Sequence, residues 1–471
     1  MKIQEFINQI ITEFGFQPTS DQLQALETFG RFLADRDMRS VMIMRGSAGT
    51  GKTSLAGAMV RTFHRLGQKL QLMAPTGRAA KVFARNCGLP AYTIHRRIYR
   101  EKSYTGLNGD FSVNNNMYKN TLFMIDEASM CSSDLLPDLV NYVYSGDNCR
   151  MLLIGDKAQL PPVGEDEAPA LDAEVLQYAG LRVYECDLNE VLRQSNTSGI
   201  LYNATIVRQM ITHDEATELP KISFSGFADI VVMPGNEIVD SISDSYYNVG
   251  EDETIVVTRS NKTANIYNQG IRNVVLDRED ILCGGDRIMI VKNKYYLPAD
   301  STISKGDGKG EKALSFLANG DVCVVQRVRR QRELYGFKFA DVTLSFPDYD
   351  DIEIEQTAIL DTLMSEAPAL TEQQSEELYN RVMEDYADVP LKRNRLQKLK
   401  EDVYYNALQI KFAYAVTCHK AQGGQWQHVY VDQGYMTDDM LTPDYIHWLY
   451  TAFTRATEKL FLVNWPKTQT K

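Results

Sequence analysis

Glycines, a lysine and a threonine stand between positions 46 and 53 at the spacing of a phosphate-binding loop. The segment reads GSAGTGKT and fits GxxxxGK[ST] at every fixed position. It follows the apolar run Val41–Met44 and precedes a helix that we expect to begin near Lys52. Glycines let the backbone turn its N–H groups toward phosphate oxygens, and a helix N-terminus adds partial positive charge. The pattern predicts that Lys52 reaches the β- and γ-phosphates of ATP and that Thr53 binds Mg²⁺. The residues expected to hold the nucleotide are Gly46, Ala48, Gly49, Thr50, Gly51, Lys52, Thr53 and Ser54.

Two carboxylates follow a second apolar run, Leu122–Ile125. A buried strand there would deliver Asp126 to its carboxyl end, where the carboxylate can hold Mg²⁺ through water. Glu127 beside it can polarise the attacking water. An apolar strand that ends in Asp-Glu is common by itself, but after a matching phosphate loop it indicates an ATPase.

Five segments then resemble the ordered motifs of superfamily 1 helicases. The spellings APTGRAA and HKAQG are similar to those of the RecD and Dda branch, whose members move 5′ to 3′ on single-stranded DNA. The resemblance covers nearly the whole chain. It implies an ATP-dependent DNA helicase that translocates and unwinds duplex DNA, and the polarity rests on the resemblance alone. The segments are Ala74–Ala80, Ile125–Met130, Gly155–Val163, Thr417–Gly423 and Tyr450–Ala456.

The resemblance also implies roles at the nucleotide. Gln159 resembles a γ-phosphate sensor, and Arg455 resembles the arginine finger that the second motor domain supplies. Arg193 looks like a second such arginine, and Gly423 of the HKAQG segment is assigned to the nucleotide site. Gln22 resembles the adenine-reading glutamine of these helicases; the alternative is a surface residue near a helix start.

Further positions would contact nucleic acid. Thr76 follows a strand end, where its hydroxyl and nearby backbone N–H groups could bind a phosphate. The segment from position 96 to 120 occupies the place of a strand-separating pin, and its aromatics Tyr99, Tyr104 and Phe111 could stack on a base. They could equally form a small hairpin core. The expected nucleic-acid contacts are Pro75, Thr76, Gly77, Arg78, Thr93, His95, Arg96, Thr417, His419 and Lys420.

Short apolar runs followed by polar or glycine-rich loops must position these residues. Runs that are apolar at nearly every position predict strands buried on both faces, hence parallel sheets covered by helices. We therefore expect an α/β fold, and the helicase resemblance implies two RecA-like P-loop domains. The runs of the first sheet are Val41–Met44, Leu70–Met73, Leu122–Ile125 and Met151–Ile154. Those of the second are Ile230–Val232, Thr254–Val257, Phe412–Thr417, His428–Val431 and Leu460–Val463.

An insertion interrupts the second set of strands. Val322–Val328 and Phe337–Phe346 flank Gly336 and resemble a β-barrel hairpin. Thr371 and Gln374 predict a capping box ahead of a helix, and the basic run between positions 392 and 400 is either a solvated face or a nucleic-acid contact. The expected domains are 1–200 with the pin insertion at about 96–120, then 201–318 plus 407–471, and 319–406 as an SH3-like barrel and helical insertion.

Bulk properties set limits on these interpretations. The chain has 471 residues and a formal net charge of −12, which by itself argues against nucleic-acid binding. From Thr76 to Arg100, however, there are six basic residues and no acidic one. The seven cysteines form no CxxC pair, so a reducing, cytoplasmic setting fits best. No apolar run reaches 18 residues, which predicts no membrane span. The first 14 residues have the spacing of an amphipathic helix rather than a signal peptide.

Three alternatives remain open. A translocase that strips proteins from single strands shares every ATPase motif and differs at the pin. A nucleotide-dependent clamp would hydrolyse ATP merely to release DNA. RNA could replace DNA as the substrate. The expected partners are single-stranded DNA and single/double-strand junctions, with a single-strand-binding protein as a further partner, and the chain is expected to work as a monomer.

Overall fold

The computed structural model spans residues 1–471 and describes residues 3–35, 37, 39–100, 112–190, 197–213, 219–294, 302–303 and 317–471. The chain divides into two compact units. The first comprises Met1–Arg100, Ser112–Gly235 and Cys418–Lys471. The second comprises Glu101–Phe111 and Asn236–Thr417.

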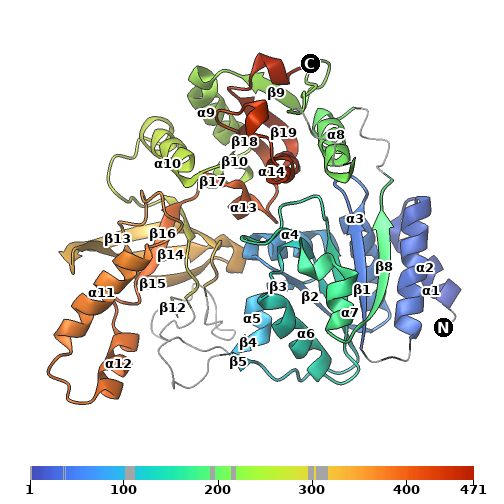
Figure 1. Ribbon diagram of the computed structural model, residues 1–471, viewed down its shortest axis with the longest axis horizontal. Coiled ribbons are helices and arrows are strands. Elements are labelled where there is room, and N and C mark those ends of the chain that lie inside the picture. Colours follow the sequence, from blue (N-terminus) through green and yellow to red (C-terminus); the bar gives the residue numbers. More distant parts are fainter. Residues whose placement is uncertain are drawn as a thin grey trace. The chain divides into compact units, whose positions relative to one another are not determined.

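A six-stranded parallel sheet forms the centre of the first unit, in the order β3-β2-β6-β7-β1-β8. All four strands predicted for the first sheet are present in it, so the α/β fold class is confirmed here (Figure 1). The bounds are β1 Ser40–Gly46, β2 Lys69–Ala74, β3 Ala91–Thr93, β6 Thr121–Ile125, β7 Arg150–Gly155 and β8 Arg182–Leu188.

Side chains alternate between two cores along these strands, because successive residues of a strand point to opposite faces. In β1, Met42 and Met44 join the core beneath the first four helices. Val41 and Ile43 join the core on the other face. The helices of the first face are α1 Ile3–Phe14, α2 Ser20–Ala34, α3 Lys52–Arg65 and α4 Gly77–Cys87; those of the second are α5 Ile94–Ile98, α6 Leu135–Ser145 and α7 Ala173–Tyr178.

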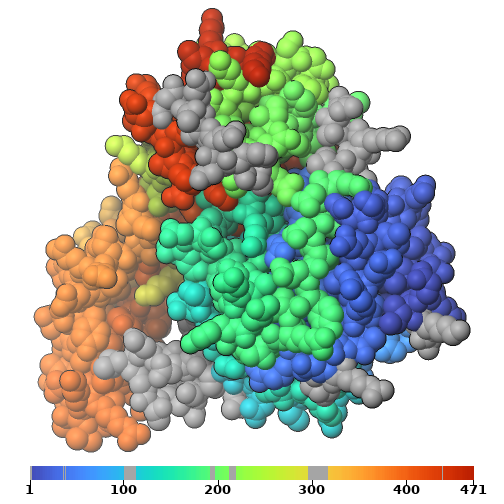
Figure 2. All heavy atoms as spheres, turned by 45° about the vertical axis from the view of Figure 1, so that its right-hand side comes forward, coloured from blue at the N-terminus to red at the C-terminus, as the bar shows by residue number. Residues whose placement is uncertain are grey.

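The N-terminal amphipathic helix is confirmed as α1. Phe6, Ile7, Ile10 and Phe14 are buried in the core, while the polar positions between them remain outside. Helix α2 packs on β8, and the blue N-terminal segment covers one side of the first unit (Figure 2). The two helices therefore complete the core over the phosphate-binding strand.

The rest of the first unit carries a second, smaller parallel arrangement. Strand β18 pairs with β19, and β19 pairs with β9. A two-stranded antiparallel hairpin, β4–β5, lies where the pin is predicted. The bounds are β4 Tyr99–Arg100, β5 Ser112–Val113, α8 Gly199–His213, β9 Ile230–Met233, α13 Cys418–Ala421, β18 Trp426–Asp432, α14 Pro443–Phe453 and β19 Ala456–Val463.

The second unit contains a closed β-barrel. Its strands pair in the order β15-β14-β13-β11-β16, and β16 returns to β15, so a barrel insertion is confirmed. The barrel also includes β11 and β16, which lie outside the predicted insertion at 319–406, because these two flanking strands are needed to close the barrel. The bounds are α9 Ile238–Asn248, β10 Thr254–Thr258, α10 Asn261–Gly270, β11 Arg287–Ile290, β12 Thr302–Ile303, β13 Val322–Leu334, β14 Phe337–Phe346, β15 Ile352–Ile359, α11 Glu372–Asp385, α12 Lys392–Glu401, β16 Leu408–Phe412 and β17 Ala415–Thr417.

One predicted strand is wrong in its extent. The run Phe412–Thr417 is divided: Phe412 ends β16 of the barrel, and Ala415–Thr417 forms β17 beside β10. The side-chain amide of Asn268 accepts hydrogen bonds from the backbone N–H groups of Tyr414 and Ala415 at 3.1 and 2.8 Å. Since a side chain takes these donors, the ladder is interrupted and the chain changes sheets. The capping box of Thr371 and Gln374 is confirmed at the start of α11.

All seven cysteines lie in the part of the chain that the structure describes, and none forms a disulfide. Six are buried and Cys283 is partly exposed. Among the described residues, no cluster of three or more His, Cys, Asp and Glu side chains could hold a metal ion. No described helix is both long and apolar enough to cross a membrane.

Candidate ATP and nucleic-acid site

The phosphate loop joins β1 to α3, as the sequence predicted. Gly49 and Gly51 have φ angles of +78° and +80°, which disfavour any side chain. At Gly46 an added Cβ would lie 2.8 Å from Thr50 Oγ1 and 2.9 Å from Leu188 Cβ. The Lys52 ammonium folds back and donates to the carbonyl oxygens of Gly46 and Ser47. The loop thus places the Lys52 cation beside the N-terminus of α3, an arrangement that fits a phosphate.

The two carboxylates lie at the carboxyl end of β6, next to this loop. Burial and the neighbouring Glu127 raise the pKa of Asp126 to about 7, opposed by the Glu127 backbone N–H and by Lys52. That N–H donates to Asp126 Oδ1 at 3.0 Å. Glu127 has a φ of 53°, a strained conformation for a residue with a side chain. A cation beside Asp126 would favour its ionised form, so Asp126 and Thr53 fit the Mg²⁺ that the loop implies.

Arg455, from the turn after α14, approaches the same carboxylates. Its Nη1 lies 4.0 Å from Glu127 Oε1, and the residue is only 2% exposed. Nε donates to Thr451 O at 3.0 Å and Nη1 to Gly424 O at 3.1 Å, which fixes the guanidinium. The C-terminal segment thus brings its predicted arginine finger to the predicted catalytic glutamate within one compact unit.

Gln159 follows the end of β7 and is buried. Its backbone N–H donates to Asp156 O at 3.2 Å. Its side-chain Oε1 has no hydrogen-bond partner among the described residues, although it is enclosed. The Ser47 hydroxyl of the phosphate loop is likewise enclosed and without a partner there. Buried polar atoms of this kind usually find a partner, so both are consistent with a site that closes around a ligand.

Sequence reasoning missed Tyr450, which links the C-terminal segment to the phosphate loop. The Ala48 backbone N–H donates to its hydroxyl at 2.8 Å, and the hydroxyl donates to Asp156 Oδ2 at 2.6 Å. Burial and the Asp156 carboxylate hold the pKa of Tyr450 well above its usual range. Its position five residues before Arg455, in the same motif, was the available signal.

Two neighbours of Tyr450 on α14 contact the backbone of the loop after β7. Thr451 Oγ1 accepts from the Leu160 N–H at 2.8 Å, and His447 Nδ1 lies 2.9 Å from Ala158 O. Residues three and four apart share a helix face, so His447, Tyr450 and Thr451 form one contact surface.

Gln22 is buried rather than a surface residue, so that alternative is wrong. Its Oε1 accepts from the Thr19 N–H at 3.0 Å in a capping box at the start of α2. Its Nε2 donates to the Thr50 carbonyl of the phosphate loop at 2.9 Å. The residue therefore touches the phosphate loop, and its role at the adenine stays a prediction.

The predicted nucleic-acid residues of the first unit gather at two helix N-termini. Thr76 caps α4 by accepting from the Ala79 N–H, and Thr93 caps α5 by accepting from the Arg96 N–H. Arg78 donates to Gln425 O at 2.9 Å and stacks over Trp426. Burial lowers the pKa of His95. Pro75 and Gly77 flank Thr76.

The remaining predicted positions are distributed more widely. His419 and Lys420 lie in α13 of the first unit, whereas Thr417 ends β17 of the second unit. Gly423 has a φ of +75°, and an added Cβ would lie 3.4 Å from Thr76 Oγ1. It therefore lies against the start of α4. Arg193, Tyr104 and Phe111 fall outside the described residues.

Two family models match the chain: an AAA domain over residues 19–219 and a UvrD-like helicase C-terminal domain over residues 412–463. The ATP-dependent RecD2 DNA helicase of Deinococcus radiodurans is 34% identical over 26% of this chain and 16% of its own length. The chain belongs to the superfamily 1 helicases, in the RecD-like group. The predicted family is thereby confirmed, and with it an enzyme of the ATP-driven DNA helicase class.

Other relatives of this helicase chain extend over more of its length. An uncharacterized protein of Acanthamoeba polyphaga mimivirus is 22% identical over 90% of this chain and 96% of its own length. A solved structure of Bacteroides Pif1 bound to single-stranded DNA covers 97% of this chain and 94% of its own, at 16% identity and a TM-score of 0.42. A Pif1 helicase structure from Candida albicans has 17% identity and a TM-score of 0.41, and covers 96% of each chain.

Proposed function

We propose that this helicase hydrolyses ATP with Mg²⁺, translocates 5′ to 3′ on single-stranded DNA and unwinds duplex DNA at single/double-strand junctions. The observation that carries the proposal is the 4.0 Å approach of Arg455 to Glu127 beside the phosphate loop. An arginine finger and a water-polarising carboxylate that face each other are the parts needed for transfer of a phosphoryl group to water.

Each charged residue of the site has a role in the proposed hydrolysis of ATP. Water attacks the γ-phosphorus, its proton passes to Glu127, and the bond between the γ-phosphorus and the bridging oxygen of ADP breaks. Lys52 and Arg455 stabilise the negative charge that spreads over the γ-phosphoryl oxygens. Mg²⁺ at Thr53 and Asp126 would neutralise charge on the β- and γ-oxygens. Gln159 would report the presence of the γ-phosphate to the loop after β7.

Movement would follow from a change in these contacts during each cycle. ATP brings Arg455 onto the γ-phosphate, and loss of the phosphate releases it, so the two motor domains alternate between two arrangements. We place those domains at 1–200 and at 201–318 with 407–471, and assign residues 319–406 to the insertion that supplies β13, β14 and β15 of the barrel. The protein would act as a monomer, and a single-strand-binding protein would hold the separated strand.

Strand displacement on duplexes with either a 5′ or a 3′ single-stranded DNA tail tests this function. We expect unwinding from the 5′ tail alone, with ATP and Mg²⁺. Lys52→Ala should abolish both hydrolysis and unwinding, and normal turnover in that variant would contradict the assigned site. DNA-stimulated hydrolysis without displacement from either tail would favour a translocase or a clamp.

A further inference from the structure

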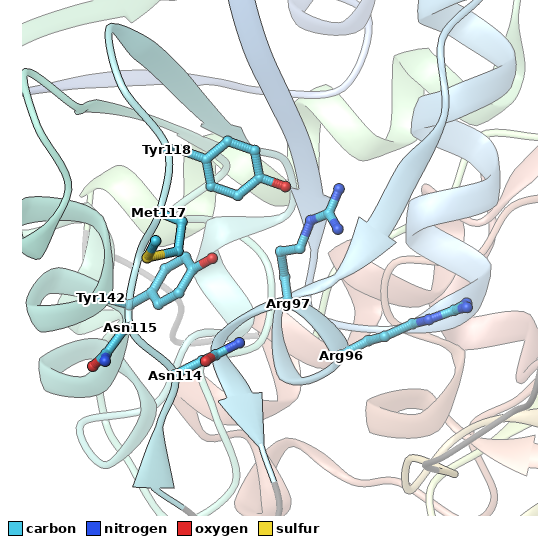
Figure 3. A pocket seen from close by; sticks show the side chains of 7 residues that line it. All are labelled: Arg96, Arg97, Asn114, Asn115, Met117, Tyr118 and Tyr142. Carbon is cyan, nitrogen blue, oxygen red and sulfur yellow. The ribbon is translucent and has the colours of Figure 1, made fainter.

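A cavity with a mixed polar and apolar lining lies beside the paired strands β4 and β5 in the first unit, outside the ATP site. Its volume is about 320 Å³. Figure 3 shows the hydroxyls of Tyr118 and Tyr142 pointing toward Arg97, and the Asn114 amide directed to the same space, while Arg96 extends away. The lining residues are Arg96, Arg97, Asn114, Asn115, Met117, Tyr118 and Tyr142.

Arg97 is held in place without a countercharge. Its guanidinium stacks 4.2 Å from the centroid of Tyr92 and donates from Nε to Gln71 Oε1 at 3.1 Å. No carboxylate among the described residues forms an ion pair with it. The Nη2 of Arg97 also donates to Gln71 Oε1, at 2.5 Å, and the centroid of the Tyr118 ring lies 5.7 Å from the guanidinium carbon. A planar guanidinium held in this way can present its remaining edge to a planar or tetrahedral oxyanion.

The groups that face Arg97 can all donate hydrogen bonds. Tyr142 is 2% exposed, whereas Tyr118 is partly exposed, and both residues line the cavity. A phenol hydroxyl that is directed into a cavity can donate a hydrogen bond to a bound oxyanion. The carboxylate of Asp138, one turn before Tyr142 on α6, is taken by the Tyr99 hydroxyl at 2.7 Å. The lining of the cavity therefore combines two arginines with several hydrogen-bond donors and no carboxylate.

We propose that this cavity binds one backbone phosphate of the DNA strand that passes the β4–β5 hairpin, with Arg97, Tyr118 and Tyr142 as its donors. This proposal rests on the proposed function, because that function brings a DNA strand to the hairpin. The chain as a whole has a net charge of −12, which repels DNA. A phosphate is therefore expected to bind where basic residues are concentrated, as they are in this cavity. A phosphate anchored beside the hairpin fixes the register of the strand without reading its sequence.

The salt dependence of DNA binding tests the proposal, because each neutralised phosphate contributes separately to it. Affinity for a forked duplex and for single-stranded DNA would be measured over a range of salt concentrations. Arg97→Gln should weaken binding about tenfold at low salt and reduce the slope of log K against log salt by about 0.7 to 0.9. Tyr142→Phe, which keeps the ring, should weaken binding about threefold.

Arg39→Gln is the matched control. Arg39 is an exposed arginine of the same unit that also stacks on a tyrosine, Tyr144, at 5.8 Å, but it does not line the cavity. Replacement of Arg39 by Gln should leave the slope of log K against log salt unchanged. A slope for Arg97→Gln equal to that of the wild type, on both DNAs, would overturn the proposal. If Arg97→Gln does not fold, wild-type affinity in Tyr142→Phe overturns it instead.

Calorimetric titration with inorganic phosphate distinguishes the source of the anion. If Arg97→Gln abolishes binding of inorganic phosphate but leaves the DNA affinity and slope unchanged, the cavity takes a free anion and the proposal is wrong. DNA-stimulated ATPase at saturating single-stranded DNA separates this result from the proposed function. Single-stranded DNA should stimulate the ATPase of both the wild type and Arg97→Gln. A wild type whose ATPase is not stimulated would contradict the proposed motor function. The salt slope of DNA binding would still test the cavity independently.

Discussion

The Tyr450 hydroxyl donates a 2.6 Å hydrogen bond to Asp156, which couples helix α14 to the loop after β7. Because the same hydroxyl accepts from the Ala48 N–H of the phosphate loop, one atom joins three segments that are far apart in sequence. A change at the nucleotide that moves Ala48 must therefore move Tyr450 or break this bond.

Tyr450→Phe should lower both stability and turnover. It leaves Asp156 Oδ2 and the Ala48 N–H without this partner, which costs about 1–3 kcal/mol of unfolding free energy. We expect DNA-stimulated kcat to fall about tenfold, equivalent to ~1.4 kcal/mol in the barrier. Tyr445→Phe removes a buried hydroxyl from the same helix, where it donates to Gln433. That control should lose stability but keep kcat; equal kcat losses would show that the effect is merely structural.

Asp126→Asn should stabilise the metal-free protein above pH 7. The pKa of Asp126 is raised from 3.8 to about 7, so its ionised form destabilises the fold. This penalty is absent below about pH 3.8, grows as the pH rises, and is complete above about pH 7. The gain in Tm should therefore be largest at pH 8 and should shrink toward pH 4.

Magnesium provides the control for this experiment. Mg²⁺ with nucleotide should raise the Tm of the wild type by more than that of Asp126→Asn, since the amide has no negative charge to offset that of the ion. Equal Tm values for the two proteins at pH 8 without metal would contradict the raised pKa.

Arg455→Ala should abolish hydrolysis while ATP still binds. An arginine finger typically accelerates phosphoryl transfer by 10³–10⁵, so we expect kcat to fall by about three orders of magnitude. Fluorescent-nucleotide binding and single-turnover hydrolysis measure the two effects separately. Arg455→Lys retains charge but cannot donate to Thr451 O and Gly424 O from a planar fork, so it should restore little activity. Full activity in the lysine variant would rule out the finger role.

Gln22→Ala should remove the preference for ATP over GTP. The residue contacts the phosphate loop through Thr50 O and is assigned to the adenine. Thr19→Val is the control, since it breaks the other half of the capping box and costs about 1 kcal/mol of α2 stability. The ratio of ATP to GTP affinity should change in the first variant and not in the second. An unchanged ratio in both would leave Gln22 a structural residue.

The sequence predicted those parts of the fold whose evidence is local. The phosphate loop, the four buried strands and the capping box at Thr371 depend on neighbours within a few residues, and all are present. The divided strand at Phe412–Thr417 was missed because its cause, the Asn268 amide, lies about 145 residues away. The barrel extends beyond the expected insertion for the same reason, since pairing of β11 with β16 joins residues that are distant in the chain.

In the candidate site, too, local sequence evidence predicted some residues, whereas contacts between distant segments could not be predicted. Motif spacing predicted Lys52, Asp126 and Glu127, and the helicase resemblance predicted Arg455; the structure places these four residues near one loop. Spacing could not reveal the contacts of Tyr450 or the unpaired Arg97, because each depends on side chains that only folding brings close.

The distribution of thiols has a practical consequence. Burial raises the pKa of the six buried cysteines, so few thiolates form there at neutral pH. Cys283, just before β11, is partly exposed. The natural sequence therefore offers a thiol-reactive fluorophore one preferred point of attachment, so the barrel-bearing unit can be observed during turnover without first replacing the other cysteines.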